Sequence, residues 1–272
     1  MIFSPSLSTT VSRSGSSYYE PNYSVPKMIE RTTAIPLVIY PYSTRSHIVH
    51  WLTRHHGLIS TLLKAAQHPR SRFLGEYQLF GTTELLYYNC HKEGLYTAKE
   101  CALLHPREAY RQNWRAMQTA SYLTALFRKI LPQNAPAPHL FHHLELLLDY
   151  TLHFHTHSLY LPWCELSISQ HEGNTPQLNQ CGNCQKNHVE FFAPAQGTAL
   201  CRNCAHRAST PTQPLSPQLQ SLAQTLLQTE IPHNLPNEAT HTPHLPALNH
   251  LTGTFMSATY QLPPRHRNAI AA

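Results

Sequence analysis

The sequence predicts an α+β protein in which a small β-barrel is followed by a helical domain that carries an inserted Cys-rich unit. Short runs of β-branched and aromatic residues recur at even spacing from residue 33 to residue 104, with turn signals between them. After His105-Pro106 the apolar residues change to helical spacing. Two CxxC pairs then begin at Cys181 and Cys201, which is typical of a metal site.

The composition limits the class of protein. Hydrophobic residues make up 41% of the 272 residues, which is too many for a globally disordered chain. No run approaches the roughly 18 apolar residues of a transmembrane helix. The first residues also lack the charged and continuous apolar regions of a secretory signal. The net charge of +6 favours a polyanionic partner.

Residues 1–31 are expected to be a disordered extension, because they are rich in Ser, Thr, Tyr and Pro and show no periodicity. Met28 lies just before the first strand-like segment. This raises the hypothesis that Met28, and not Met1, is the true start of the protein.

Residues 32–105 are predicted to form the barrel. Five or six short strands in about 75 residues fit an OB-type barrel better than a sandwich. The strand-like segments are TAIPLVIY at 33–40, SHIVHWLTR at 46–54, LISTLLKAA at 58–66, LGEYQLFG at 74–81, TELLYYNC at 83–90 and LYTAKECALL at 95–104.

The helical domain is expected in two parts, at 106–176 and 209–272, the second including the basic tail. Pro132 and the APAP stretch at 135–138 should end the first helix, and Ser216-Pro217 should cap a later one. A loop is expected at 231–245, which is rich in Pro and His. The predicted helices cover 107–131, 139–161, 161–169, 215–229 and 244–262.

The unit at 177–208 contains four cysteines with the spacing of a zinc ribbon: Cys181, Cys184, Cys201 and Cys204. Sixteen residues separate the pairs, which fits one hairpin with strands HVEFF and TAL and the turn PAQG. Gly182 and the Asn residues suit tight turns because they tolerate positive φ. Four thiolates predict one structural Zn²⁺ with no open position. A rubredoxin-like iron site and two turns of free thiols are the alternatives.

The other titratable residues do not form a recognisable catalytic site. Cys90, Cys101 and Cys164 lie in apolar contexts and are expected to be buried as small hydrophobic residues. The 21 His residues include no HExxH motif, and the sequence has no Gly-rich phosphate loop. The abundance of His is attributed to lineage composition, and no enzymatic activity is expected.

The barrel region is markedly basic, because no acidic residue lies between Glu30 and Glu76. In a small barrel this predicts a positive face for phosphates, with an ordinary solvated face as the alternative. Trp51 is expected in the core, whereas Phe73 and Tyr77 could offer stacking surfaces. The basic residues of this stretch are Arg31, Arg45, Arg54, Lys64, Arg70 and Arg72.

The order of these parts resembles the RecO family of bacterial DNA repair and recombination mediators, over roughly residues 32–262. Three stretches carry the resemblance: RHHGL at 54–58 with KAAQHPRSRF at 64–73, GLYT at 94–97, and Cys181 to Cys204 with FFAP between them. Only the Cys unit is specific by itself. The family usually has Lys-Gly-Ala followed by two basic residues, whereas this chain has Ala65 and then Gln67-His68.

The resemblance implies a cytoplasmic, nucleoid-associated protein that binds single- and double-stranded DNA and anneals complementary strands. It implies action with RecR to load RecA onto DNA coated by single-strand-binding protein, whose acidic C-terminal tail the helical domain would engage. The candidate phosphate contacts are Arg45, Arg54, Lys64, Arg70 and Arg72. The alternatives are a zinc-ribbon OB protein that binds structured RNA, ribosome- or tRNA-associated, and a metal-dependent enzyme.

Overall fold

The computed structural model describes residues 28–89, 94–263 and 267. Most of the expected N-terminal extension, from residue 1 to residue 27, and Cys90 lie outside the described residues. The first strand begins at Met28, earlier than the expected boundary at residue 32. Residues 28–31 are therefore part of the barrel and not of the extension.

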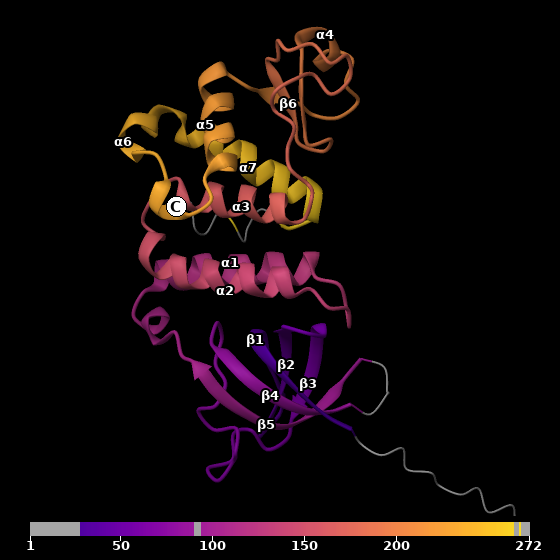
Figure 1. Cartoon of the computed structure of the whole chain (residues 1–272), viewed down its shortest axis with the longest axis vertical. Coiled ribbons are helices and arrows are strands. Elements are labelled where there is room, and N and C mark those ends of the chain that lie inside the picture. Colours follow the sequence, from indigo (N-terminus) through magenta and orange to yellow (C-terminus); the bar gives the residue numbers. More distant parts are fainter. Residues whose placement is uncertain (1–27, 90–93, 264–266, 268–272) are drawn as a thin grey trace, which may run out of the picture.

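The barrel has five strands and closes on itself (Figure 1). The order around it is β1-β2-β3-β5-β4, with β3 and β5 parallel and the other pairs antiparallel. This is the arrangement of a small Greek-key barrel of the OB type, as the strand spacing predicts. The strands are β1 (Met28–Ser43), β2 (Ser46–Thr53), β3 (Gly57–Leu63), β4 (Thr82–Asn89) and β5 (Tyr96–His105).

The long strand β1 closes the barrel because it pairs with β4 through its first half and with β2 through its second half. A register shift between Pro36 and Val38 bends it between the two partners. Trp51 is fully buried inside, and its indole N–H donates a hydrogen bond of 2.8 Å to Thr61 Oγ1. The prediction that Trp51 belongs to the core is confirmed.

One predicted strand is absent: residues 74–81 form turns and loop instead. Within this segment Phe80 and Gly81 are buried, whereas residues 74–79 are exposed or half-buried. Glu76 also accepts a hydrogen bond at Oε2 from the backbone N–H of Leu103, at 3.1 Å. Since β3, β4 and β5 already use both edges in the closed barrel, no edge remains for a further strand.

The helices follow the predicted positions closely, except at one end. The predicted helix over 139–161 ends at Phe154, and α3 starts separately at Tyr160. The loop expected at 231–245 contains short helical turns. The elements are α1 (Trp114–Ile130), α2 (Pro138–Phe154), α3 (Tyr160–His171), α5 (Pro217–Gln228), α6 (Glu238–His241), α7 (Leu245–Tyr260), and 3-10 turns at Glu108–Arg111, Pro232–Asn234 and Thr242–His244.

The helix caps explain why the sequence locates these helices well. The Asn113 side chain accepts from the backbone N–H of Ala116 at the start of α1. Ser216 caps α5 by accepting from the backbone N–H of Leu219, with Pro217 at the first helical position. Both satisfy N–H groups that a helix start leaves without a partner.

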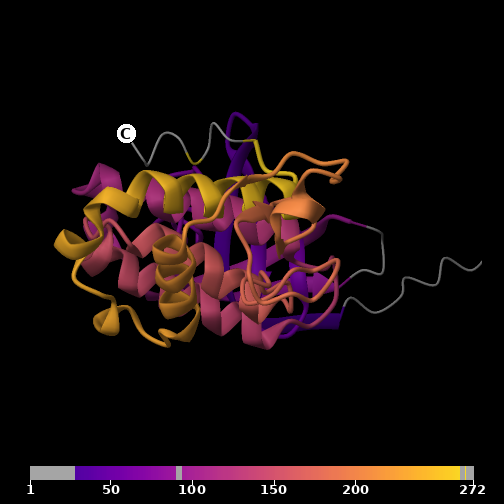
Figure 2. The same cartoon turned by 90° about the horizontal axis from the view of Figure 1, so that it is seen from above.

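The Cys-rich unit lies at the end of the molecule opposite the barrel (Figure 1). It contains β6 (Phe191–Ala193), β7 (Thr198–Leu200), α4 (Arg202–Ala205) and β8 (Gln213–Pro214), in the sheet order β7-β6-β8. The predicted hairpin and its turn at 194–197 are confirmed. Seen from above, α5 and this unit lie over the other helices, with the barrel behind them (Figure 2).

The barrel and the helices are joined tightly at the β2–β3 turn and at Arg107. Gly57 has φ +64°, and a Cβ there would lie 2.0 Å from the carbonyl oxygen of Ala135, so only glycine fits. Leu58 donates its backbone N–H to Pro132 O at 3.2 Å. Buried Arg107 donates from Nε to Asp149 Oδ1 at 2.6 Å and from Nη1 to the Phe80 carbonyl at 2.7 Å.

These contacts join the barrel and the helices around one hydrophobic core. Ile35, Leu52 and Leu58 of the barrel belong to the same buried cluster as the apolar residues of the helices. In the described part of the chain, no helix is both long enough and apolar enough to span a bilayer.

Candidate metal centre and nucleic-acid interface

The four cysteines of the Cys-rich unit converge, as their spacing predicts. Their sulfur atoms all lie within 4.8 Å of one another, and Cys184 Sγ is 3.7 Å from Cys201 Sγ. That separation is far too long for a disulfide bond. A tetrahedral zinc site with Zn–S bonds of about 2.3 Å spaces its sulfurs by about 3.8 Å. The four side chains could therefore hold a metal ion, and the geometry is consistent with zinc.

The residue that adopts a positive φ in the first CxxC turn differs from the prediction. The residue with positive φ in the first CxxC turn is Gln185, at φ 60°, and not Gly182. Gly182 is needed for a different reason: a Cβ there would lie 2.4 Å from Thr198 Oγ1 on β7. The loop thus packs directly on the hairpin, which brings the first cysteine pair over the second. The sequence alone shows a small residue but not the strand against it.

The surroundings of the thiols favour a bound cation. Burial raises the pKa of the Cys181 thiol, but backbone N–H groups of Cys201 and Cys184 outweigh it and bring the pKa down to about 6. Hydrogen bonding to the Cys201 and Cys181 sulfurs raises the pKa of Cys204 to about 12. Four thiolates accumulate at this spacing only if a cation compensates them. A metal bound here supplies folding energy, and four sulfurs leave no position for a water ligand.

Cys101 and Cys164 are both buried, as predicted, and Cys164 is completely enclosed. Burial raises the pKa of the Cys101 thiol to about 12. Both are therefore inert packing residues in the described structure.

Most of the predicted phosphate-binding residues gather at the end of the barrel that faces away from the helices. Arg45 lies in the β1–β2 turn, and Lys64 directly follows β3. Backbone bonds hold the two segments together, from Gln67 N–H to Arg45 O at 3.1 Å. Arg70 and Arg72 lie on the loop that follows, where Arg72 Nη1 donates to the Lys99 carbonyl at 3.4 Å.

Arg54 is not part of this group. It lies in the β2–β3 turn at the opposite end of the barrel. Its guanidinium lies over the ring of Phe141 in α2, 5.6 Å from the centroid, which is a cation–π contact. The structure places Arg54 at the junction with the helices, and a phosphate contact there stays a prediction.

The two aromatic residues predicted as stacking surfaces, Phe73 and Tyr77, contact other parts of the barrel instead. Phe73 is buried in the barrel core. The Tyr77 hydroxyl forms a hydrogen bond of 2.5 Å with His47 Nδ1, and Gln67 Nε2 lies 2.7 Å from His47 Nε2. Burial raises the pKa of Tyr77 to about 12. These contacts fix the basic loop on β2, so that Lys64, Arg70 and Arg72 have a defined position.

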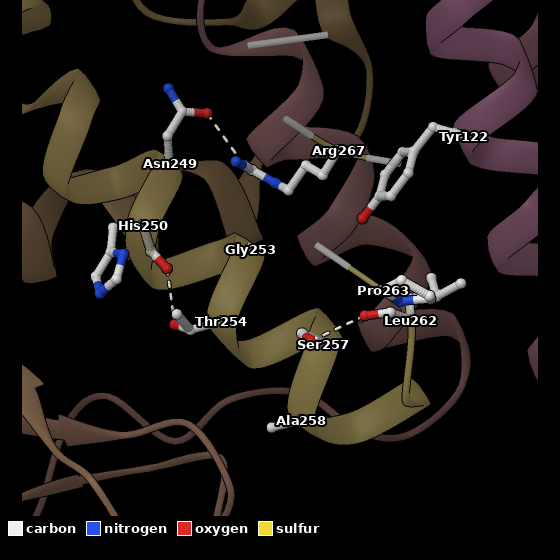
Figure 3. A pocket seen from close by; sticks show the side chains of 10 residues that line it. All are labelled: Tyr122, Asn249, His250, Gly253, Thr254, Ser257, Ala258, Leu262, Pro263 and Arg267. Atoms are coloured by element: carbon white, nitrogen blue, oxygen red, sulfur yellow. Dashed lines mark hydrogen bonds between the residues drawn. The ribbon is translucent and has the colours of Figure 1, made fainter. Parts of the chain in front are cut away.

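A separate cavity of about 660 Å³ lies beside α7, and its lining includes Tyr122 and Arg267 (Figure 3). Arg267 Nε and Nη2 donate to the two carboxylate oxygens of the fully buried Glu165 at 2.7 and 2.9 Å. Nη2 also donates to Asn249 Oδ1 at 3.0 Å, and the Tyr122 hydroxyl donates to Glu165 at 2.6 Å. This network is a buried and fully paired charge, which gives it a structural role.

Comparison with known proteins covers both halves of the chain. Residues 28–107 match the family model described as Recombination protein O N terminal, and residues 111–268 match that described as Recombination protein O C terminal. The DNA repair protein RecO of Thermodesulfovibrio yellowstonii is 28% identical over 181 residues, covering 64% of this chain and 69% of that protein.

Two further relatives give the same picture. The DNA repair protein RecO of Bacillus pumilus is 28% identical over 183 residues, covering 65% of this chain and 69% of that protein. That of Myxococcus xanthus is 27% identical over 233 residues, covering 74% of this chain and 91% of that protein. With an OB-type barrel, a helical domain and a Cys₄ cluster in matching order, the chain belongs to the recombination protein O (RecO) family.

Proposed function

We propose that this chain acts in DNA repair and recombination as a mediator that binds single- and double-stranded DNA and anneals complementary strands. Family membership and the names of the relatives support the repair role. The observation that supports DNA binding most directly is the group of Arg45, Lys64 and Arg70 at the free end of the barrel. Within the described residues, none of these three side chains has a hydrogen-bond or ion-pair partner.

The mechanism is binding and not bond-making. Cationic side chains neutralise phosphates and release condensed counterions, so affinity falls as salt rises. When cations of one protein surface neutralise the phosphates of two strands, the strands repel each other less and already lie close together. Pairing is therefore accelerated without a nucleotide cofactor.

The proposal also includes protein partners in DNA recombination. The chain would act with RecR to load RecA onto DNA coated by single-strand-binding protein, and its helical domain would engage the acidic tail of that protein. Support comes from the family alone. The Cys-rich unit would contribute by holding the fold of the helical domain.

The test is annealing of two complementary oligonucleotides coated with the cognate single-strand-binding protein, with and without the purified chain. Acceleration without ATP is the expected result. Replacing Arg45, Lys64 and Arg70 together by Ala should abolish most of the acceleration. The slope of log affinity against log salt for single strands should also flatten by about 2 units, since each phosphate contact contributes about 0.7.

A matched control removes the same number of charges elsewhere. Lys186 and Arg207 of the Cys-rich unit and Arg115 of α1 are exposed and lie outside the barrel. Their joint replacement by Ala should leave annealing intact. Equal loss in both triple variants would show non-specific charge attraction, and absence of acceleration by the folded parent chain would overturn the proposal. Tighter binding to structured RNA than to DNA would favour the RNA-binding alternative.

A further inference from the structure

Histidines of α2 and α3 face each other where the start of α2 lies beside the end of α3. Only residues 155–159 connect the two helices, so they run antiparallel. His139 and His143 lie one turn apart on α2, and Ser167 and His171 lie one turn apart on α3. His143 contacts both residues of α3, because its Nε2 lies 3.3 Å from Ser167 Oγ and its ring centroid lies 4.0 Å from that of His171.

His139, at the start of α2, lies close to the last residues of α3. Burial and, after it, the charge of His139 lower the pKa of His171. Burial raises the pKa of Glu172, and the charge of His139 opposes that rise. Such charge effects act over short distances, so His139 is a neighbour of both residues. Three imidazoles and one carboxylate thus meet between two helices.

These groups have ligand atoms to spare. In the part of the chain that the structure describes, the side chains of His139, His171 and Glu172 have no hydrogen-bond or ion-pair partner. His139 and His171 are exposed and Glu172 is half-buried, so all three side chains are free to rotate toward an ion. His143 is buried between the rings of Phe127 and His171 and offers a fixed imidazole.

The chemistry of these groups selects the class of ion. Imidazole nitrogen with a carboxylate suits Zn²⁺, Co²⁺ and Ni²⁺, whereas Mg²⁺ and Ca²⁺ prefer oxygen ligands alone. Two histidines four positions apart on a helix present their imidazoles on one face, which is a spacing that zinc sites use. Among the described residues, the Cys₄ cluster has its ligand atoms already gathered. The histidine group differs because its exposed side chains must close around the ion.

We propose that the start of α2 and the end of α3 form a second metal site, for a divalent transition ion, with the ligands His139, His143, His171 and Glu172. The site is separate from the Cys₄ cluster and does not depend on DNA binding. A bound ion would link α2 to α3 and should stabilise the fold, because an ion that binds only the folded chain shifts the folding equilibrium.

The experiment uses Co²⁺, because its absorption spectrum reports which atoms bind it. The full chain is first loaded with Zn²⁺ and dialysed, so that the four thiolates keep their ion while more weakly held ions leave. Titration with Co²⁺ should then fill about one further site per chain and raise the melting temperature. Co²⁺ held by nitrogen and oxygen lacks the intense sulfur-to-metal absorption of Co²⁺ held by thiolates, so exchange into the Cys₄ cluster is recognised from the spectrum.

Two variants remove exposed ligands. His139→Ala and His171→Ala should each weaken Co²⁺ binding by at least about tenfold, since loss of a group that merely orients a ligand already costs about 10–100-fold. Glu172→Gln keeps the shape of the side chain but removes its charge, and it should also weaken binding. The matched control is His142→Ala, which removes an exposed imidazole of α2 whose Nδ1 faces Glu145 at 3.9 Å instead. It should bind Co²⁺ as the parent does.

The outcomes decide the site and each part of it. Equal melting temperatures of parent and variants before Co²⁺ is added would show that the fold is intact. A zinc-loaded parent that takes up no Co²⁺, or takes it up only with the thiolate spectrum, would overturn the proposal. So would an equal loss in His142→Ala and His171→Ala, because it would indicate scattered binding to surface histidines. Unchanged binding in Glu172→Gln would remove the carboxylate from the ligands.

Discussion

At the residue scale, His143 on α2 is an imidazole that the fold keeps neutral. It is 7% exposed, and the ring of His171 from α3 lies against it, tilted by 35°, with centroids 4.0 Å apart. Ser167 Oγ lies 3.3 Å from its Nε2. Burial, followed by the neighbouring imidazoles of His171, His142 and His139, lowers the pKa of His143 to about 3.

This environment predicts acid sensitivity. Because the pKa of His143 is lower in the folded than in the unfolded state, the unfolded chain binds an extra proton between about pH 6.5 and pH 3. Stability should thus be constant above that window and fall within it as the pH falls, by up to about 1.4 kcal/mol per pH unit. Urea unfolding between about pH 4 and about pH 7 gives the free energy of unfolding at each pH and so measures this slope.

The comparison variants isolate the imidazole. His143→Gln keeps a polar group near Ser167 and should reduce the acid slope, even if it lowers stability at neutral pH. Substitution of the exposed His153 on the same helix provides the control. Identical slopes for the parent and His143→Gln would contradict the prediction.

At the element scale, the sequence predicts what depends on local signals. The Ser216-Pro217 cap, the CxxC pairs and the alternation around Trp51 all act over a few residues, and the structure contains each of them. The convergence of the four cysteines could therefore be predicted from the sequence.

What the sequence does not predict depends on contacts distant in the chain. Residues 74–81 look like a strand, but barrel closure leaves them no edge. Gly182 serves close packing against Thr198 and not a turn, and Arg54 faces Phe141 at the junction.

The Cys-rich unit should depend on its metal as one element. Cys204→Ser removes one of four converging sulfurs, so the chain should lose most of its metal, about one ion per chain in the parent, and melt at a lower temperature. Metal analysis together with thermal melting measures both effects. Cys101→Ala, which leaves a cavity in the barrel, should lower the melting temperature but retain the metal. Full metal content in Cys204→Ser would refute the assignment.

At the scale of the whole molecule, the barrel and the helices share one buried cluster, whereas the Cys-rich unit lies at the far end (Figure 1). Arg107 is one of the polar links between the two larger parts, since it binds Phe80 on the barrel side and Asp149 on α2. Tyr110 adds a bond of 2.6 Å from its hydroxyl to Leu148 O. A shared core implies that these two parts unfold together.

Arg107→Ala tests that coupling. The substitution leaves the buried Phe80 carbonyl without its donor and should lower the free energy of unfolding by about 2–3 kcal/mol. Calorimetry should show the main transition shifted to a lower temperature but still single. The control is Arg111→Ala, whose side chain bonds Gln78 on the exposed surface. A main transition that splits, or one that does not shift, would contradict the prediction.

The Arg267 network has a practical consequence for anyone who handles this protein. Glu165 lies deep between helices, yet its counter-charge comes from a residue only five positions from the end of the sequence. Gly253 leaves the guanidinium room to pass, because a Cβ there would lie 2.9 Å from Arg267 Nε. Removal of the last six residues would take Arg267 with them and leave the buried Glu165 carboxylate without its counter-charge, so truncation at the carboxyl end should destabilise the fold.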